Sequence, residues 1–384
     1  MSRISTIQGR KILDSRNKPT VEVKIETDDG FMAIDSVPSG TSTGQSEAAL
    51  VDPTTAVDNI NNILAPKLKN MDVLDQEAID HKMIEIDGTE NKSKIGANAI
   101  LGISLSVARA AALASKMPLY WYINKLYSKI ANQNLEPALP TPMMVMICGG
   151  KHGGNDVCIQ EFLAIGQLDD GIKLWNTLEE ILIDKKIIFN LGLEGGFSPQ
   201  IKKDEEALDL ISLAIDKANL TGKIKLGLDI AGSNCKMSND QILNLIKKYD
   251  IFSVEDPFGE KDWEKFGQLK LEVKEIKENF LIIGDDIFAT HKKLLEKGIN
   301  NLVANGIIIK VNQVGTLTET IEVVQLAKKA NFSCIVSHRS GETTDTFIAD
   351  LAVGLAADYL KSGAPIPRER ILKYQRLKEI SNEL

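Results

Sequence analysis

The sequence has few cysteines, and their arrangement argues against several kinds of site. Only four occur in 384 residues, Cys148, Cys158, Cys235 and Cys334, and none forms a Cys-x-x-Cys pair. No histidine stands at a zinc-finger spacing from them, which argues against a structural zinc site. We therefore expect four free thiols, as is usual in a reducing cytoplasm, and a cytoplasmic protein.

The sequence also lacks the features of membrane-spanning and nucleic-acid-binding proteins. Its first residues contain no apolar core of a signal peptide. The most apolar stretch, residues 97–114, is interrupted by Ser104, Ser106 and Arg109, so we expect no membrane span. With 45 basic and 53 acidic residues the net charge is −8, which argues against a nucleic-acid partner.

The N-terminal third reads as three strands followed by helices. Residues 4–13 and 31–37 are two of the strands, and residues 20–26 alternate apolar and charged side chains as a half-buried strand does. Residues 28–30, Asp-Asp-Gly, predict a turn between the last two strands. Helical patterns dominate residues 46–127.

Three prolines in residues 137–142 mark the best candidate for a domain boundary, because they favour an extended connector. We therefore divide the chain into a smaller N-terminal α+β domain, residues 1–134, and a second domain, residues 135–384. After Pro140, 244 residues remain, close to the roughly 250 of an eight-stranded α/β barrel. Short apolar runs alternate there with helix-like stretches, which favours parallel βα units and a TIM-like barrel.

Five apolar runs of the second domain each end in an ionisable residue. These residues are Asp229, Glu255, Asp285, Lys310 and His338. Successive intervals are 26, 30, 25 and 28 residues, close to the roughly 30 residues of one βα unit. The spacing predicts that all five lie at the carboxyl ends of successive strands, where barrel enzymes carry their active sites.

The three acids of this series predict a metal site. A single one could be a strand end that meets solvent, but Asp229, Glu255 and Asp285 would repel one another unless a cation lay between them. An incomplete set of hard oxygen ligands suits Mg²⁺, which keeps positions open for substrate oxygens. We predict one magnesium site formed by these three carboxylates.

Lys310 and Glu194 are candidates for a base and an acid. A nearby divalent cation disfavours the ammonium form of Lys310, which lets it act as a base, although it could also be a plain counter-ion to the acids. Glu194 lies in the glycine-rich segment 192–196. On its own it could be a loop carboxylate, but we expect it on the same barrel face, opposite Lys310.

Other polar residues fit a site for an anionic ligand. The run 337–343, Ser-His-Arg-Ser-Gly-Glu-Thr, follows an apolar segment and places His338, Arg339 and Ser340 at a strand end. Arginine presents a planar fork of donors that suits a phosphate. Lys361 adds a positive charge for a carboxylate or a phosphate.

Two more segments could contribute to this site. His152 lies among the glycines of a loop, residues 149–154, where the backbone can approach a ligand closely. Gln160 and Glu161 interrupt an apolar strand over residues 157–164, and a buried carboxylate there needs a partner. The remaining histidines, His81 and His291, have no such context and are expected at the surface.

These residues, with several longer motifs, resemble the enolase family. The similarity extends over nearly the whole chain, from residues 9–16 to residues 373–374. The intervening matches are Val-Pro-Ser-Gly-Thr-Ser-Thr-Gly at 37–44, Gly-Ala-Asn-Ala-Ile-Leu-Gly at 96–102, Gln-Glu-Phe at 160–162, Glu-Asp-Pro-Phe at 255–258, Gly-Asp-Asp at 284–286, Ile-Lys-Val-Asn-Gln at 309–313 and the run at 337–342. The resemblance implies an enolase-type barrel and a lyase, phosphopyruvate hydratase, that interconverts 2-phospho-D-glycerate and phosphoenolpyruvate in glycolysis and gluconeogenesis.

The resemblance also implies chemical roles. Lys310 would remove the proton at carbon 2, and Glu194, helped by Glu161, would assist the departure of the carbon-3 hydroxide. His152 matches a residue on a loop that closes on substrate. Lysine bases and one or two Mg²⁺ ions are already known for the enolase superfamily, so this motif is a family property.

The binding residues follow from the same resemblance. The three strand-end acids would hold a first Mg²⁺, and Ser42, on a mobile loop, would help to hold a second Mg²⁺ that arrives with the substrate. The resemblance assigns the phosphate to Arg339 and Ser340 and the substrate carboxylate to Lys361. We count Gln160 and His338 among the substrate-binding residues. A homodimer or higher homo-oligomer is implied by the family alone.

The sequence departs from the family pattern at a few positions. Leu193 stands where an Asp usually precedes the acid, Cys148 replaces an Asn, and Asn234 replaces a Glu after the first metal ligand. Departures such as Leu193 and Cys148 leave open a paralogue that acts on a related phosphonate or sugar acid. A separate alternative is a non-catalytic scaffold or adhesion protein on the same fold.

Overall fold

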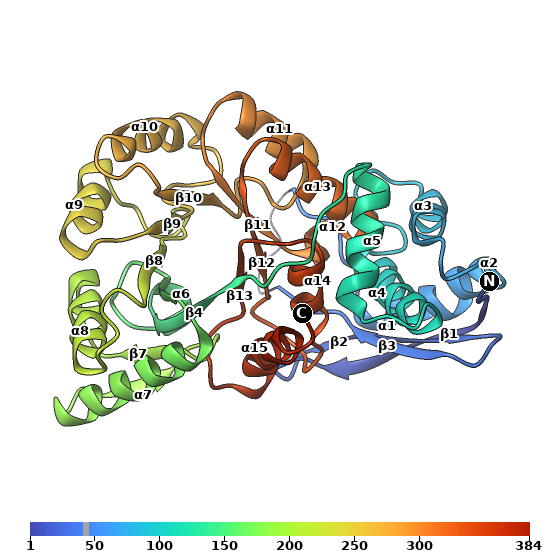
Figure 1. Ribbon diagram of the computed structural model, residues 1–384, viewed down its shortest axis with the longest axis horizontal. Coiled ribbons are helices and arrows are strands. Elements are labelled where there is room, and N and C mark those ends of the chain that lie inside the picture. The colour runs from blue at the N-terminus through green and yellow to red at the C-terminus, as the bar shows by residue number, and fades with distance from the viewer. Residues whose placement is uncertain (41–45) are drawn as a thin grey trace.

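The computed structural model describes residues 1–40 and 46–384, and it divides into two lobes (Figure 1). The first lobe contains an antiparallel sheet of β1 (Ile4–Leu13), β2 (Pro19–Thr27) and β3 (Met32–Ser36), in the order β1-β2-β3. The three strands match the predicted segments to within one residue at each end.

The sheet packs against α4 (Ala97–Ala114), the most apolar helix of the lobe. A Cβ atom at Gly102 would lie only 2.6 Å from Cγ2 of Val23, so glycine is what allows this close approach. Ser106 donates a 2.9 Å hydrogen bond to the carbonyl of Val23. Of the described helices, α4 alone is long and apolar enough to cross a membrane, and 83% of it is buried inside the protein. A mostly buried helix of this kind is also typical of a globular core.

The other helices of the first lobe lie on the same side of the sheet as α4 (Figure 1). They are α1 (Pro53–Asn59), the π-helical segment η1 (Ile60–Leu64), α2 (Ala65–Leu68), α3 (Gln76–Asp87) and α5 (Leu119–Ala131). Asp52 begins α1 with a side-chain cap, because its carboxylate accepts the backbone N–H of Thr54 at 2.8 Å.

The second lobe is a closed barrel, as predicted. Among the described residues eight strands complete the ring, in the order β4-β5-β8-β9-β10-β11-β12-β13, with β13 paired to β4. Their bounds are β4 (Thr141–Cys148), β5 (Glu161–Ile165), β8 (Lys225–Asp229), β9 (Ser253–Glu255), β10 (Leu281–Gly284), β11 (Gly306–Ile309), β12 (Ser333–Ser337) and β13 (Tyr359–Lys361). The five predicted ionisable residues all lie at, or one position after, the carboxyl ends of β8 to β12.

One strand departs from the predicted parallel arrangement. β5 runs antiparallel to both of its neighbours, β4 and β8, whereas the other barrel neighbours pair in parallel. A short antiparallel hairpin of β6 (Phe189–Leu191) and β7 (Phe197–Pro199) extends from β4. Because β5 is reversed, its first residue, Glu161, lies at the same rim as the last residue of β8, Asp229.

Helices surround the barrel (Figure 1). They are α6 (Gly150–Gly153), α7 (Leu168–Asp184), α8 (Asp204–Lys217), α9 (Asn239–Tyr249), α10 (Trp263–Lys274), α11 (Lys292–Asn300), α12 (Val311–Val314), α13 (Leu317–Lys329), α14 (Phe347–Gly354) and α15 (Arg368–Ser381). A separate cluster of buried side chains, which includes Val145, Leu163, Ile283 and Ile335, comes from the barrel strands. The barrel is therefore a packed core whose polar chemistry is confined to its rim.

The two lobes meet directly beside the barrel rim. Ser39 and Gly341 form an antiparallel backbone bridge between the lobes. Next to it, the backbone N–H of Ser15 donates a 2.7 Å hydrogen bond to the carbonyl of Glu342. A Cβ at Gly341 would lie 2.2 Å from a carboxylate oxygen of Asp14, so a larger residue here would displace the side chains at this seam. The first lobe thus holds the turn that follows β12.

Candidate active site

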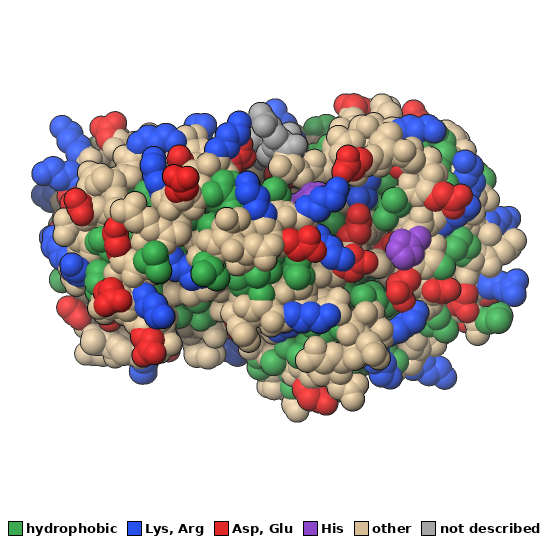
Figure 2. All heavy atoms as spheres, turned by 90° about the horizontal axis from the view of Figure 1, so that it is seen from above, with side chains coloured by type: hydrophobic (Ala, Val, Ile, Leu, Met, Phe, Trp, Pro, Cys, Tyr) green, Lys and Arg blue, Asp and Glu red, His purple; other side chains and the backbone are tan. Residues whose placement is uncertain are grey.

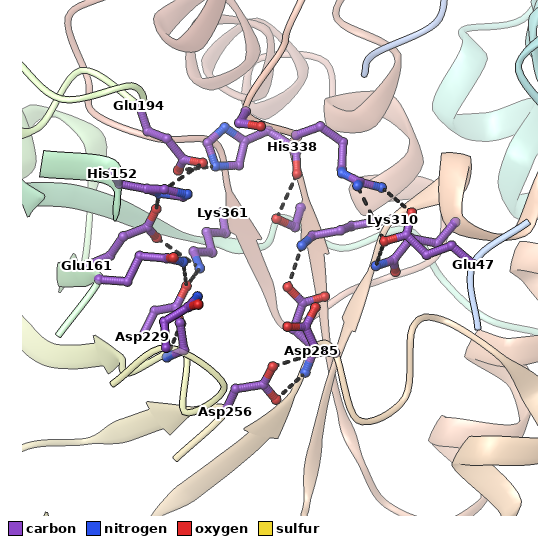
Figure 3. A pocket seen from close by; sticks show the side chains of 18 residues that line it. Glu47, His152, Glu161, Glu194, Asp229, Asp256, Asp285, Lys310, His338 and Lys361 are labelled. Carbon is purple, nitrogen blue, oxygen red and sulfur yellow. Dashed lines mark hydrogen bonds and ion pairs between the residues drawn. The ribbon is translucent and has the colours of Figure 1, made fainter. Parts of the chain in front are cut away.

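A cavity of about 120 Å³ lies at the carboxyl rim of the barrel (Figure 3). The predicted site residues that line it are His152, Gln160, Glu161, Glu194, Asp229, Asp285, Lys310, His338, Arg339, Ser340 and Lys361. Glu255 lies behind this lining, is 1% exposed, and accepts a hydrogen bond from Lys361. Ser42, the predicted ligand of a second metal ion, lies outside the described residues.

Two carboxylates and two histidines form one side of the cavity. Glu161 begins β5, and Glu194 lies in the turn between β6 and β7. His152 Nδ1 lies 3.0 Å from Oε1 of Glu161 and 3.8 Å from Oε1 of Glu194. On the other side of Glu194, Oε2 lies 2.7 Å from Nε2 of His338. Both carboxylates are buried, so these contacts take the place of water.

The two carboxylates differ in their affinity for a proton. Burial and the nearby charge of Glu194 raise the pKa of Glu161. Burial also acts on Glu194, but the adjacent rings of His338 and His152 hold its pKa well below the usual value. The surroundings therefore favour a proton on Glu161 over one on Glu194. Burial and both carboxylates raise the pKa of the Cys148 thiol, which stays neutral behind them.

The two histidines have opposite charge states. Burial disfavours the charged ring of His152, but its hydrogen bond to Glu161 and the carboxylate charges around it raise its pKa to about 9. Burial, together with the positive charge of Arg370, lowers the pKa of His338 to about 4 despite Glu194. Arg370 donates to Nδ1 of His338, which leaves the ring proton on Nε2, facing Glu194.

A buried lysine neutralises the acids in the middle of the site. Lys361, the last residue of β13, has its Nζ 2.7 Å from Glu255, 3.0 Å from Asp229 and 3.0 Å from Glu161. Although burial opposes it, these carboxylates raise the pKa of Lys361 well above its usual value. Gln160 donates a further, longer hydrogen bond of 3.3 Å to Asp229.

Lys310 stands on the side of the cavity opposite Glu194 (Figure 3). Its ammonium group forms an ion pair with Asp285, and this pairing raises the pKa of Lys310 although burial acts against it. Asp256 holds the backbone of Asp285 and its neighbour Asp286, whose N–H groups donate to the Asp256 carboxylate at 2.9 and 2.7 Å. Asp256 itself has a positive φ of 39°, a backbone conformation that is strained for a residue other than glycine.

The carboxylates on this side fit a divalent cation. One oxygen of Asp285, Oδ1, is buried and has no hydrogen-bond partner in the described part of the chain. Burial and the charge of Asp229 raise the pKa of Glu255 well above its usual value, even with Lys361 beside it. Asp285 also offers an oxygen within 4.8 Å of oxygens from Asp256 and Asp286. Hard oxygen donors with a surplus of negative charge suit Mg²⁺.

The turn after β12 is organised around its arginine. Arg339 is buried, and its guanidinium donates to Oε2 of Glu47 at 3.1 Å and to Oδ1 of Asn312 at 2.9 Å. The carbonyls of Arg339 and Ser340 accept hydrogen bonds from Arg370 at 2.7 and 2.8 Å. Arg370, which is fully buried in α15, therefore holds both this turn and the ring of His338.

Some sequence expectations were wrong in detail. His152 lies in the short helix α6 rather than in a loop, and Gln160 precedes β5 instead of lying within a strand. Cys158 and Cys235 are joined by a disulfide bond, so only Cys148 and Cys334 are free. The spacing of these two cysteines in the sequence carries no signal, because the fold alone brings their segments together.

The sequence also left three contributors unnamed as site residues. Asp256 lies inside the predicted Glu-Asp-Pro-Phe motif, and its position next to a predicted metal ligand could have identified it. Glu47 and Arg370 have no local signal, because both reach the site from other elements. His291 was expected at the surface but is half-buried at the start of α11.

Comparisons with known proteins agree with this geometry. Residues 4–123 match the family model described as "Enolase, N-terminal domain", and residues 136–245 and 234–384 match "Enolase, C-terminal TIM barrel domain". The chain is 42% identical to "Enolase B" of Dictyostelium discoideum over 429 aligned positions, which cover 99% of this chain and 95% of that protein. With an enolase-type barrel and acidic groups suited to a metal at its rim, the chain belongs to the enolase family and has phosphopyruvate hydratase activity.

Proposed function

We propose that in this enolase Lys310 is the base and Glu194 the acid of the dehydration of 2-phospho-D-glycerate. The observation that carries the proposal is their position on opposite sides of one cavity, with the acidic cluster between them (Figure 3). A base on one face and an acid on the other match a reaction that removes a proton from carbon 2 and hydroxide from carbon 3.

Lys310 must be neutral to accept the proton. In the described arrangement its ammonium is the counter-ion of Asp285. Binding of a divalent cation by Asp285, Glu255 and Asp229 would supply that counter-charge and also stabilise the negative charge that develops on the substrate carboxylate. Lys310 then loses its ion-pair partner and lies beside a like charge, which lowers its pKa. Lys361, already held among these acids, is placed to orient the substrate carboxylate.

The leaving group needs a proton on the other side. The Glu161–Glu194 pair retains one proton because both carboxylates cannot ionise together in a dry site. We propose that this proton, which the surroundings favour on Glu161, passes to Glu194, and that Glu194 delivers it to the carbon-3 hydroxyl group. His338 donates its Nε2 proton to Glu194 and so holds the carboxylate in position, while His152 covers both carboxylates from the cavity side.

The remaining assignments are part of the same proposal. Arg339 and Ser340 bind the substrate phosphate, Gln160 contributes to the substrate site, and two Mg²⁺ ions act, the second arriving with the substrate beside Ser42. We also propose that domain 1–134 caps a catalytic domain 135–384, that the protein is a cytoplasmic homodimer, and that its substrate is a small phosphorylated acid. Mass measurement by light scattering tests the dimer.

Direct turnover of 2-phosphoglycerate, followed by the ultraviolet absorbance of the enol product, tests the function. Turnover with Mg²⁺, its loss in EDTA and its return on adding Mg²⁺ are the expected results. Activity that is unchanged in EDTA would contradict the metal assignment. Turnover of only a related phosphonate or sugar acid would instead support the paralogue. Equilibrium dialysis, with and without a substrate analogue, tests for the second Mg²⁺.

A further inference from the structure

A disulfide bond joins two segments that line the cavity. Cys158 lies between α6 and β5, and Cys235 lies in the segment after β8, 77 positions further along the chain. Their Cα atoms are 5.3 Å apart. Gln160, two residues after the first cysteine, and Asn234, directly before the second, both line the cavity. The bond therefore connects two parts of the cavity wall.

The two cysteines have different backbone anchors. The backbone N–H groups of Cys158 and Ile159 donate to Oδ1 of Asp204, at the start of α8, at 3.0 and 2.9 Å. The N–H of Cys235 donates instead to the carbonyl of Ala231 at 3.1 Å, within its own turn. Hydrogen bonds also join Gln160 to Asp229, at the end of β8. The disulfide is the covalent link between the two segments.

The turn that carries Cys235 is also connected to the acidic side of the site. The N–H of Gly232 donates a 2.8 Å hydrogen bond to the carbonyl of Asp256, and Asp256 holds the backbone of Asp285. A Cβ at Gly232 would lie 2.3 Å from the backbone of Phe258, so the turn packs tightly against this motif. Movement of this turn would therefore displace Asn234 and also the acidic residues Asp256 and Asp285.

The two cysteines of the disulfide bond differ in exposure to solvent. Cys158 is exposed, whereas Cys235 is 2% exposed. The two remaining cysteines, Cys148 and Cys334, are buried, and burial raises the pKa of both thiols, so neither is a good nucleophile. Cys158 is therefore the cysteine that an external thiol can reach.

We propose that Cys158 and Cys235 form a thiol–disulfide exchange site that controls how tightly the cavity holds its substrate. A thiolate from a dithiol reductant attacks Sγ of Cys158 and forms a mixed disulfide, while the bond to Cys235 breaks and Cys235 leaves as a thiolate that takes up a proton. The second thiol of the reductant then releases Cys158 as a thiol, and the reductant is left oxidised. Re-formation of the bond requires a disulfide oxidant.

The consequence for the enzyme is a change in substrate binding. Reduction removes the covalent link between the Gln160 and Asn234 walls and leaves the hydrogen bonds of Gln160 to Asp229 as the connection between them. We expect the KM for 2-phosphoglycerate to rise several-fold on reduction, with a smaller change in kcat, because Lys310 and Glu194 lie on other elements. The effect on KM rests on the proposed role of Gln160 in substrate binding, whereas the exchange chemistry does not.

Alkylation and kinetics on the full-length protein test the proposal. Protein treated with oxidised glutathione is compared before and after dithiothreitol, by iodoacetamide labelling and peptide mass measurement. Reduction should add labels at Cys158 and Cys235. Cys158→Ser, at an exposed position, should show the raised KM without reductant and no further response to dithiothreitol. Cys235→Ala should behave in the same way.

The outcomes separate the parts of the proposal. Full labelling of Cys158 in the oxidant-treated protein would overturn the exchange site. A KM that is equal in both redox states, or an equal response to dithiothreitol in Cys158→Ser, would overturn the control of binding. Loss of turnover in every state, with redox-dependent labelling intact, would instead count against the proposed function.

Discussion

The two sides of the cavity neutralise buried charge in different ways. On the Glu194 side, two carboxylates are matched to two histidines. On the Lys310 side, the carboxylates are matched instead to the ammonium groups of Lys310 and Lys361. Under the proposed function, the first side gives up a proton and the second exchanges an ammonium group for a metal ion. That proposal places acid chemistry on one face of the substrate and base chemistry on the other. On the face seen in Figure 2, by contrast, acidic and basic side chains are interspersed.

The largest expected effect comes from removing the base. Lys310→Ala should abolish exchange of the carbon-2 proton with solvent, and turnover should fall by at least the roughly 10²–10⁴-fold typical of general acid–base catalysis. Exchange of deuterium from solvent, followed by NMR, is the measurement.

Glu194→Gln is the matched variant on the other side. It should retain part of the proton exchange while blocking dehydration, because a neutral amide cannot protonate the leaving group. If both variants lost both activities to the same degree, the division between the two sides would be refuted.

A smaller effect is expected when the hydrogen bonds from the backbone of Asp285 and Asp286 to Asp256 are weakened. Asp256→Asn keeps the size of the side chain but can accept only one of the two backbone N–H bonds at Asp285 and Asp286. Loss of such support typically costs roughly 10–100-fold in metal affinity or activity. Titration of the Mg²⁺ dependence of turnover measures it. Asp204→Asn, at the far anchor of the Cys158 segment, is the comparison variant that should leave the Mg²⁺ dependence unchanged.

The two histidines make the acid side sensitive to pH. Below the usual pKa of 6.5, the unfolded chain binds a proton that folded His338 does not take until about pH 4, so stability falls as the pH drops through this window. Above 6.5, folded His152 keeps a proton up to about pH 9 that the unfolded chain releases, so stability falls as the pH rises. Each limb has a slope of at most about 1.4 kcal/mol per pH unit.

Urea unfolding of the metal-free protein across this range measures both limbs. His152→Gln should remove the alkaline limb and leave the acidic one. Persistence of the alkaline limb in that variant would show that another group causes it.

The smallest effect is expected at Leu193, which departs from the family pattern directly before Glu194. Leu193 is 45% exposed and contacts the site through its backbone N–H, which donates to the carbonyl of His152 at 3.1 Å. Leu193→Asp restores the negative charge usual in the family, but water screens it, and exposed charge pairs are worth only about 0–1 kcal/mol. We expect kcat/KM to change by only a few-fold. A larger loss would mean that the acid side is more finely balanced than the structure indicates.

Much of this arrangement follows from local pattern in the sequence. The strand-end series from Asp229 to His338 is visible because each residue terminates an apolar run, and a parallel barrel repeats its rim at a constant interval. The reversed direction of β5 is not visible in this way, since an apolar run has no direction. Arg370 and the Cys158–Cys235 bond depend on contacts between distant elements, which no spacing encodes. Lys361 was expected at the substrate, and only the packing shows that three acids already surround it.

The bridge between Ser39 and Gly341 has a consequence for how the molecule can be divided. The turn that carries Arg339 is held by α15 of the second lobe and by the segment that follows β3 of the first lobe. A barrel expressed without its partner lobe would lack this backbone bridge to the proposed phosphate-binding turn. We therefore expect turnover to require both lobes.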